Sequence, residues 1–323
     1  MTVNQQDLPL VRPGRGRASE AAIPFIISGA PRSGTSLFYN LFDGHTAISW
    51  LALEGVFFEW LYSLGESSEC LLSAFTSLPT ADFLTGLRDK ELMPRLEVPY
   101  RQSVESGTVS RQELEIPWDE SALVAVLEQG LPGVCDSAAM WGLLVAAYMA
   151  ALGQPVRRYA CLKSPDYAKS AISALRMDSR ARAVVVLRDP LQALDSLKRS
   201  REMRGAKRLT WPVFATCLAE MRAMLDRIEA APAGRLRTVR FEDLVAAPDT
   251  VLRDVADWLD IVFEPCLLQP TMLGQAWPGL SSFALTEGID KRVAKRPIAA
   301  LNETELAVAQ RALAGYAACG YPL

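Results

Sequence analysis

A glycine-containing segment near the N-terminus has the residue types and spacing of a phosphate-binding loop. Residues 28–36 are SGAPRSGTS and follow the apolar run IPFII, so two glycines separated by four residues lie between a predicted strand and a predicted helix. Backbone N–H groups of such a loop point into a concavity, and the positive end of the following helix also favours an anion. The alternative is an ordinary tight turn between the strand and the helix.

The loop lacks the lysine that nucleotide triphosphatases use. Thr35 follows the second glycine, where those proteins have a lysine for the β- and γ-phosphates, and Arg32 and Ser33 lie inside the loop. We therefore expect the loop to bind one 5′-phosphate and an attached anionic group without magnesium. The expected contacts are Arg32, Ser33, Gly34, Thr35 and Ser36.

A second anion site is predicted at the end of the run ARAVVVLR, residues 181–188. Arg188 ends this predicted strand, and Ser196 follows eight residues later, about two turns into a helix opened by Pro190. The planar guanidinium and the hydroxyl can converge on one phosphate. Alone, the two residues would indicate a salt bridge at a helix start and a surface serine. Two phosphate sites without magnesium ligands describe a nucleotide phosphorylated at both its 3′ and 5′ ends.

A basic run follows this second site. Residues 198–208 are KRSREMRGAKR. They form either a rim that attracts an anionic ligand or a solvated helix end. Lys198 and Arg199 are nearest to the predicted 3′-phosphate site.

Three further residues are candidates for transfer chemistry. Lys163 ends the predicted strand RYACLK, where its charge can stabilise a transferring anionic group; the alternative is a solvated lysine. Glu54 lies among apolar residues, which suit a general base unless an arginine pairs with it, and Glu59 is the second choice. His45 ends the helix after the loop, where an imidazole more often caps carbonyl groups than it accepts a substrate proton.

The elements that position these residues are predicted to form a parallel sheet. Strands are expected at 24–28, 158–163, 181–188 and 235–244, and each is followed by a helical pattern. The fold class is therefore α/β, a P-loop-type parallel sheet with helices on both faces. Residues 55–150 have helical periodicity and no clear strand, which predicts a helical insertion or lid that shapes an acceptor pocket at the carboxyl edge of the sheet.

Composition limits the domain organisation and the possible chemistry. The chain has 323 residues, 50% hydrophobic and 22% charged, and a net charge of −3. We expect a disordered tail over residues 1–22 and a single domain over 23–323, although the length permits two domains. The net charge gives no support for nucleic acid binding. One histidine and six scattered cysteines argue against a metal site, a Ser–His–Asp relay and a disulfide framework.

No secretory signal or membrane span is predicted. The N-terminal residues lack a long apolar region, and the longest apolar stretch, 138–153, is short for a span and contains Gly142. We expect this stretch to be a buried helix and the protein to be cytoplasmic. A final helix is expected after Asn302, which is suited to be its N-cap.

Four stretches, in chain order, resemble sulfotransferases that use 3′-phosphoadenosine-5′-phosphosulfate. They are PFIISGAPRSGTSLFYNLFDGHTAIS, LKSPDYAKS, VVVLRDPLQALDSLKRSR and VRFEDLVAAPDTVLRDVADWL. The first is similar to the 5′-phosphosulfate loop of the family, and the third to its 3′-phosphate motif. The pattern is closest to the bacterial and tyrosylprotein branches; in the tyrosylprotein branch a glutamate is the base, and Glu54 lies at nearly that offset. The family's C-terminal nucleotide contacts imply Ser282, Lys295 and Arg296 here.

This resemblance implies an enzyme that transfers a sulfuryl group in line to a hydroxyl, or as second choice an amine, of a small-molecule acceptor such as a natural product. Arg32 and Lys163 would stabilise charge, Glu54 would remove the proton, and Arg188 and Ser196 would bind the 3′-phosphate. No metal, nucleic acid or membrane span is expected, and a homodimer is compatible with the sequence. The alternatives are a P-loop kinase of small molecules, which Thr35 disfavours, and a nucleotide-binding protein without catalysis.

Overall fold

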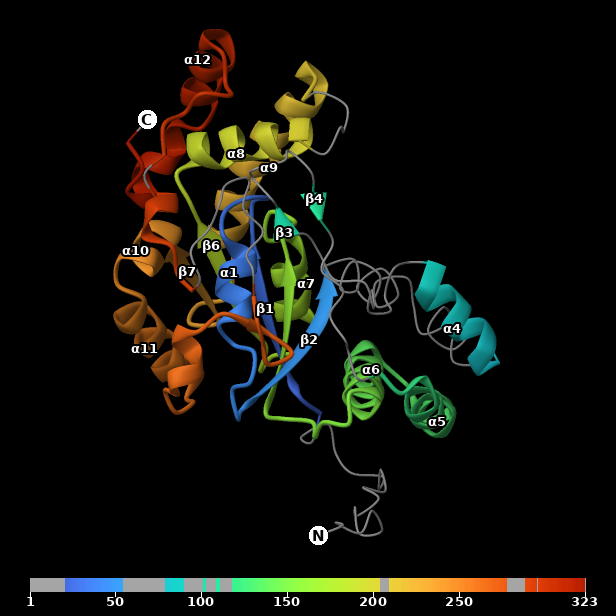
Figure 1. Ribbon diagram of the computed structural model, residues 1–323. Helices are drawn as coiled ribbons and strands as arrows, with labels where there is room; N and C mark the ends of the chain where they lie inside the picture. The colour runs from blue at the N-terminus through green and yellow to red at the C-terminus, as the bar shows by residue number, and fades with distance from the viewer. Residues whose placement is uncertain are drawn as a thin grey trace.

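A five-stranded parallel sheet forms the centre of the protein (Figure 1). The computed structural model describes residues 21–54, 79–89, 101–102, 109–110, 118–203, 209–277, 288–294 and 296–322. The strand order is β2-β5-β1-β6-β7, and every neighbouring pair is parallel. The strands are β1 (Ile23–Gly29), β2 (Ile48–Glu54), β5 (Tyr159–Ser164), β6 (Arg182–Leu187) and β7 (Leu236–Arg240).

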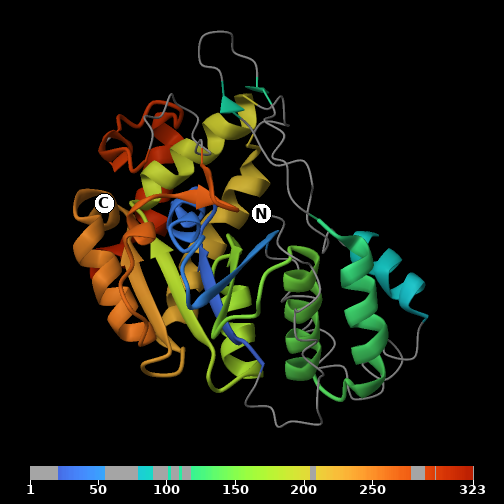
Figure 2. The same ribbon diagram turned by 60° about the horizontal axis from the view of Figure 1, so that its bottom comes forward.

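Helices cover both faces of this sheet, so the predicted α/β class is confirmed (Figures 1 and 2). The helices after the strands are α1 (Thr35–Asn40), α7 (Lys169–Met177), α8 (Pro190–Met203), α9 (Trp211–Glu229), α10 (Phe241–Ala246), α11 (Pro248–Leu259) and α12 (Glu303–Ala312). Between β2 and β5 lie α4 (Thr80–Asp89), α5 (Glu120–Gly130) and α6 (Ser137–Ala151).

Alternate residues of the central strand β1 contribute to two separate hydrophobic layers. Ile26 packs in the layer that includes α6, α7, α8 and α9, whereas Phe25 and Ile27 pack in the layer of α1, α10 and α11. Because both faces are covered, β1 and β6 are apolar at nearly every position, as the continuous runs predicted. The phosphate-loop candidate therefore begins at the most enclosed strand of the sheet.

Caps explain where two of the predicted helices begin. The Asp136 side chain accepts a hydrogen bond from Ala139 N at 2.7 Å and starts α6, which is the buried helix expected from the apolar stretch. Asn302 caps α12 in a capping box with Glu305, as expected for this N-cap.

Five strands were not predicted: the edge strand β2 and two short antiparallel pairs, one of which follows α11. The edge strand β2 pairs with β5 through contacts between segments far apart in the chain, which local sequence does not reveal. The strands β3 (Arg101–Gln102) and β4 (Val109–Ser110) form a two-residue antiparallel pair inside 55–150, where no strand was expected, since such a short pairing has no periodicity. In the described part of 55–150, α6 lies beside β2 and α5 packs against α6 (Figure 2), and Trp141 Nε1 donates to Ala22 O at 3.0 Å. That this segment is a lid over the carboxyl edge stays a prediction.

A short hairpin follows α11 and is attached to the end of α1. It consists of β8 (Thr271–Met272) and β9 (Gln275–Ala276). Asp43 accepts hydrogen bonds from Thr271 Oγ1 at 2.7 Å and from Gly274 N at 2.8 Å. This buried carboxylate therefore fixes the hairpin to the region that follows the phosphate-loop candidate.

Candidate functional site

The glycine loop connects β1 to α1 and passes very close to neighbouring elements. A Cβ atom at Gly29 would lie 2.5 Å from the Val186 carbonyl oxygen, and one at Gly34 would overlap the Phe241 ring. Gly34 also has a φ of 98°, and Arg32 has a φ of 71°, which is uncommon for a residue with a side chain. Both glycines are therefore required by the tight fit of the loop against β6 and α10, and Arg32 has a strained backbone of the kind that is concentrated at functional sites.

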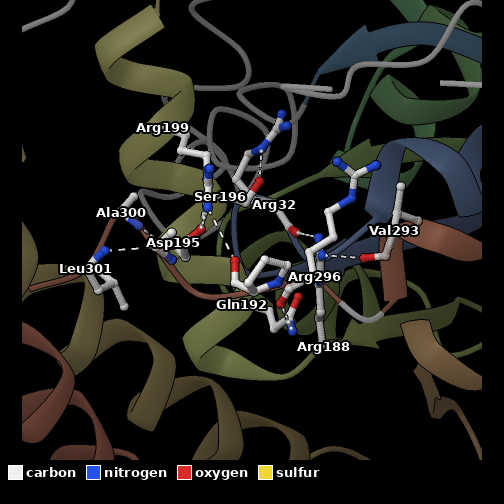
Figure 3. A network of polar contacts seen from close by, with 12 residues as sticks. Arg32, Arg188, Gln192, Asp195, Ser196, Arg199, Val293, Arg296, Ala300 and Leu301 are labelled. Carbon is white, nitrogen blue, oxygen red and sulfur yellow. Dashed lines mark hydrogen bonds and ion pairs between the residues drawn. The ribbon is translucent and has the colours of Figure 1, made fainter. Parts of the chain in front are cut away.

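Hydrogen bonds join the two anion sites that the sequence predicted separately (Figure 3). Arg32 Nε donates to Ser196 Oγ at 3.2 Å, so the loop and α8 are in direct contact. Arg188 donates from Nη1 to the Arg32 carbonyl oxygen at 3.1 Å and from Nη2 to the Val293 carbonyl oxygen at 2.9 Å. The structure thus brings Arg32, Arg188 and Ser196 together, and one ligand can contact all three.

Two buried polar atoms at this place have no hydrogen-bond partner among the described residues. They are Ser33 Oγ and Arg188 Nε. Burial lowers the pKa of the Arg188 guanidinium, against the charges of Glu242 and Asp189, and the charge of Arg296 lowers it further. The Arg188 guanidinium lies 4.7 Å from the centre of the Phe241 ring. A half-buried guanidinium with a buried Nε and an unpaired hydroxyl at a glycine loop are the groups that an anionic ligand would satisfy.

Lys163 is buried at the carboxyl end of β5 and contacts the beginning of α1. Its Nζ donates a hydrogen bond to Ser36 Oγ at 3.2 Å, next to the loop residue Thr35. Glu54 and Lys163 are register partners in the paired strands β2 and β5, after a shift in register that follows Trp50. The side chain of Glu54 lies outside the described residues, as does Glu59. The backbones of the two predicted catalytic residues therefore end adjacent strands at one edge of the sheet.

A polar turn after β5 holds the two central strands together, and sequence reasoning assigned no role to its carboxylate. Asp166 accepts hydrogen bonds from Ser28 Oγ at 2.8 Å and from Ser170 N at 2.8 Å, and Ser28 Oγ accepts one from Ala168 N at 3.1 Å. Tyr167 N donates to Gly29 O at 3.0 Å. This network ties the start of the phosphate loop to the strand that carries Lys163. The sequence signal for this role was an aspartate directly after Ser-Pro, because aspartate side chains often accept hydrogen bonds from the backbone of a turn.

Of the three nucleotide contacts expected from the C-terminal region, the structure describes Arg296 alone. Arg296 is half-buried, and burial and the charges of Arg292 and Arg199 lower its pKa, whereas the charge of Asp290 raises it. Figure 3 shows Arg296 near Arg188. Ser282 and Lys295 lie outside the described residues.

The two basic residues next to the predicted 3′-phosphate site have carboxylate partners. Lys198 Nζ lies 2.7 Å from Glu305 Oε2, and Arg199 Nη2 lies 2.7 Å from Asp195 Oδ2. Neither is the solvated helix end that was one of the two predicted alternatives. Both side chains attach α8 to the C-terminal part of the chain, and local sequence could not reveal this because Glu305 is distant from Lys198 in the chain.

His45 is buried, and both of its ring nitrogens have partners. Nδ1 accepts a hydrogen bond from Ala47 N at 3.0 Å, so the proton is on Nε2, which donates to Val262 O at 2.8 Å. The expectation that this imidazole binds backbone groups agrees with these contacts. Both nitrogens are therefore engaged with backbone groups inside the fold.

The fold and site define a class of protein, and comparisons with known proteins identify it. A model of the sulfotransferase family matches residues 24–265, so the chain belongs to the sulfotransferase family and is a sulfotransferase enzyme. Comparison with curated protein sequences gave no match.

Two solved structures have the same fold. The chain is similar to a sulfotransferase domain from the curacin biosynthetic pathway, with 19% identity and a TM-score of 0.53 over 94% of this chain and 99% of that one. It is also similar to the sulfotransferase domain of the Synechococcus PCC 7002 olefin synthase, with 17% identity and a TM-score of 0.50 over 90% of this chain and 94% of that one.

No helix in the described part of the chain is both long and apolar enough to cross a membrane. The same residues contain no group of three or more His, Cys, Asp or Glu side chains arranged to hold a metal ion.

Proposed function

We propose that this sulfotransferase moves a sulfuryl group from 3′-phosphoadenosine-5′-phosphosulfate to a hydroxyl of a small molecule, with an amine as the second choice of acceptor. The contact between Arg32 and Ser196 carries this proposal, because it joins a loop suited to a 5′-phosphate with a helix suited to a 3′-phosphate. A donor with phosphates at both ends of its nucleoside fits this pair of sites better than a triphosphate, whose phosphates lie in one chain.

The described residues fit the donor without a metal ligand. Ser33 Oγ and Arg188 Nε lack hydrogen-bond partners among them, and the bound phosphates would accept from both groups. Arg32, Ser33, Gly34, Thr35 and Ser36 hold the 5′-phosphosulfate in this proposal, and Arg188, Ser196 and Arg296 hold the 3′-phosphate. Roles for Ser282 and Lys295 in binding the nucleotide remain part of the proposal from sequence.

The reaction balances with two functional residues and no oxidant. The acceptor oxygen forms a bond to sulfur as the bond between sulfur and the bridging oxygen of the donor breaks, and the bisphosphate leaves. Glu54 takes the acceptor proton, and Lys163 stabilises the negative charge on the bridging oxygen. The pairing of Glu54 and Lys163 at adjacent strand ends supports this division of roles, because acceptor and donor must meet at one edge of the sheet.

The proposed acceptor is a small molecule of natural product biosynthesis. The names of the two structural neighbours, a curacin pathway domain and an olefin synthase domain, are compatible with this class. Residues 55–150 are proposed to shape its pocket. The family match favours sulfuryl transfer over the kinase alternative, and Thr35 in place of the P-loop lysine agrees with that choice.

Calorimetry with two nucleotides tests the proposed donor. In the presence of a chelator, the protein should bind 3′-phosphoadenosine-5′-phosphate far more tightly than it binds ATP. If ATP with magnesium binds more tightly than the bisphosphate, the donor assignment is wrong. The alternative of a P-loop kinase of small molecules is then favoured. Radiolabelled donor incubated with a library of hydroxyl and amine compounds then identifies the acceptor class.

A further inference from the structure

A C-terminal segment with no regular secondary structure lies against α8 and is held by one carboxylate. Residues 296–301 follow a short turn and precede α12. Asp195 Oδ1 accepts hydrogen bonds from three consecutive backbone groups, Ala299 N at 2.9 Å, Ala300 N at 2.5 Å and Leu301 N at 3.3 Å (Figure 3). Consecutive N–H groups directed at one anion fix the backbone dihedral angles of a segment that has no helix or strand to do so.

Other side chains of α8 bind the beginning of the same segment. Gln192 Nε2 donates to Arg296 O at 2.8 Å, and Arg199 Nη2 donates to Pro297 O at 3.3 Å. Gln192, Asp195 and Arg199 recur at intervals of three and four residues, so they lie on one side of α8. The segment is therefore attached to α8 both at Arg296 and at its other end.

The Asp195 carboxylate is unsuited to contact the donor itself. It is adjacent in sequence to Ser196, the proposed 3′-phosphate contact, and a free carboxylate would repel a phosphate there. Its charge is instead balanced by Arg199, whose Nε and Nη2 lie 2.9 and 2.7 Å from Oδ2. Its other oxygen is occupied by the backbone of the segment. Both oxygens of Asp195 are therefore directed at the segment or at Arg199, which itself contacts the segment at Pro297.

We propose that Gln192 and Asp195 are positioning residues for the sulfuryl donor, which hold segment 296–301 so that Arg296 lies beside Arg188 and Ser196 at the 3′-phosphate. This inference rests on the proposed function. The proposal explains why the Asp195 carboxylate is buried beside a phosphate site. Asp195 orders segment 296–301, which carries Arg296 as a third cationic group after Arg32 and Arg188.

The test compares two ligands that differ in the 3′-phosphate alone. Calorimetry gives the affinities of wild type and Asp195→Asn for 3′-phosphoadenosine-5′-phosphate and for adenosine 5′-phosphate. We expect the variant to lose about tenfold or more of the wild-type preference for the bisphosphate, as for one displaced charge-assisted contact, while its affinity for adenosine 5′-phosphate stays close to wild type. An equal loss for both ligands, or no loss, would overturn the inference.

A double-mutant cycle tests whether the effect passes through Arg296. In an Arg296→Ala background, Asp195→Asn should have almost no further effect on the preference, because the group that it positions is gone. If Asp195→Asn lowers the preference by the same factor in both backgrounds, Asp195 does not act through Arg296.

Asp178→Asn is the matched control for a general loss of stability. Asp178 is 8% exposed and Asp195 5% exposed, and each accepts hydrogen bonds from an arginine and from backbone N–H. Asp178 lies between α7 and the amino end of β6, whereas the candidate site lies at the carboxyl ends of the strands. Its variant should lower the melting temperature and keep the nucleotide preference.

Two further outcomes are separated by the same measurements. If Asp195→Asn does not fold, Gln192→Leu tests the inference, since it releases Arg296 O and leaves the carboxylate in place; an unchanged preference in that variant would contradict the proposal. If wild type itself shows no preference for the bisphosphate, the proposed function fails. If wild type and the folded variants all prefer the bisphosphate to the same extent, the positioning role is wrong and the proposed function still stands.

Discussion

Arg32 Nε and Ser196 Oγ are 3.2 Å apart, although 164 residues separate them in the chain. Arg32 belongs to the loop after β1, and Ser196 to the helix after β6, so the contact exists because these strands are neighbours in the sheet. Arg188 then donates to the carbonyl oxygen of Arg32 and closes the group. The residue proposed for the 5′-phosphate and the two proposed for the 3′-phosphate therefore lie in direct contact.

Arg188→Ala should weaken binding of the bisphosphate much more than binding of adenosine 5′-phosphate. Loss of one charge-assisted contact to the 3′-phosphate corresponds to roughly 10- to 100-fold in affinity. Arg235→Ala is the control, because Arg235 also donates to two carbonyl oxygens, of Leu175 and Asp178, at the opposite edge of the sheet. Calorimetry with both ligands gives the result, and equal losses for the two ligands would assign Arg188 to loop structure instead of phosphate recognition.

Glu54→Gln should lower turnover by about 10²- to 10⁴-fold and leave donor affinity nearly unchanged, because the amide keeps the shape of the side chain and removes its basicity. Steady-state rates with a saturating acceptor, together with bisphosphate affinity by calorimetry, check this. Glu242→Gln is unsuitable as a control, since Glu242 accepts hydrogen bonds near the donor site. Glu303→Gln, an exposed residue in the first turn of α12, serves instead. Near-normal turnover in Glu54→Gln would exclude it as the base.

His45→Ala should reduce stability and spare catalysis. It removes a buried side chain and its hydrogen bonds to the Val262 carbonyl and the Ala47 N–H, each worth about 0.5 to 1.5 kcal/mol. Urea denaturation measures the loss, and turnover per folded molecule at low temperature measures catalysis. A variant that is as stable as wild type yet inactive would make His45 the base.

The stability of the protein should depend on pH through Asp43. Burial raises the pKa of this carboxyl above its ordinary value of 3.8, and hydrogen bonds from Gly274 and Thr271 oppose the change. The folded state therefore holds the proton more tightly than the unfolded chain, so the contribution of Asp43 to stability is present below pH 3.8 and is lost as the pH rises through the raised pKa. Asp43→Asn should remove this part of the pH dependence of the free energy of unfolding.

A cap residue with the opposite shift is the control for that experiment. The hydrogen bond from Ser121 and that from the Ala122 backbone lower the pKa of Asp119, so its contribution is present above 3.8 and is lost as the pH falls through the lowered pKa. Asp119→Asn should change the profile on the acid side alone. Parallel profiles for wild type and Asp43→Asn would show that Asp43 has the same pKa in the folded and unfolded states.

Local patterns in the sequence predicted four of the five strands of the central sheet and the glycine loop, although residues 241–244, predicted to continue a strand, begin α10. The loop follows a continuous apolar run, and Arg188 and Ser196 lie within one strand and helix, so their spacing was visible without knowledge of the fold. The pairing of Glu54 with Lys163 was not visible, because it depends on a strand that pairs with a distant partner and shifts register on the way. The attachment of Arg199 and Lys198 to the C-terminal region was missed for the same reason: a basic side chain has one sequence pattern whether it faces solvent or a distant carboxylate.

The order of synthesis gives the attachment of segment 296–301 to α8 a kinetic consequence. All five strands of the sheet precede this segment in the chain. A growing chain therefore contains the sheet and α8 before it contains the backbone partners of Asp195. In this proposal, a ligand that requires Arg296 in place binds only after segment 296–301 is attached to α8. We expect the bisphosphate to slow unfolding and to leave the refolding rate unchanged.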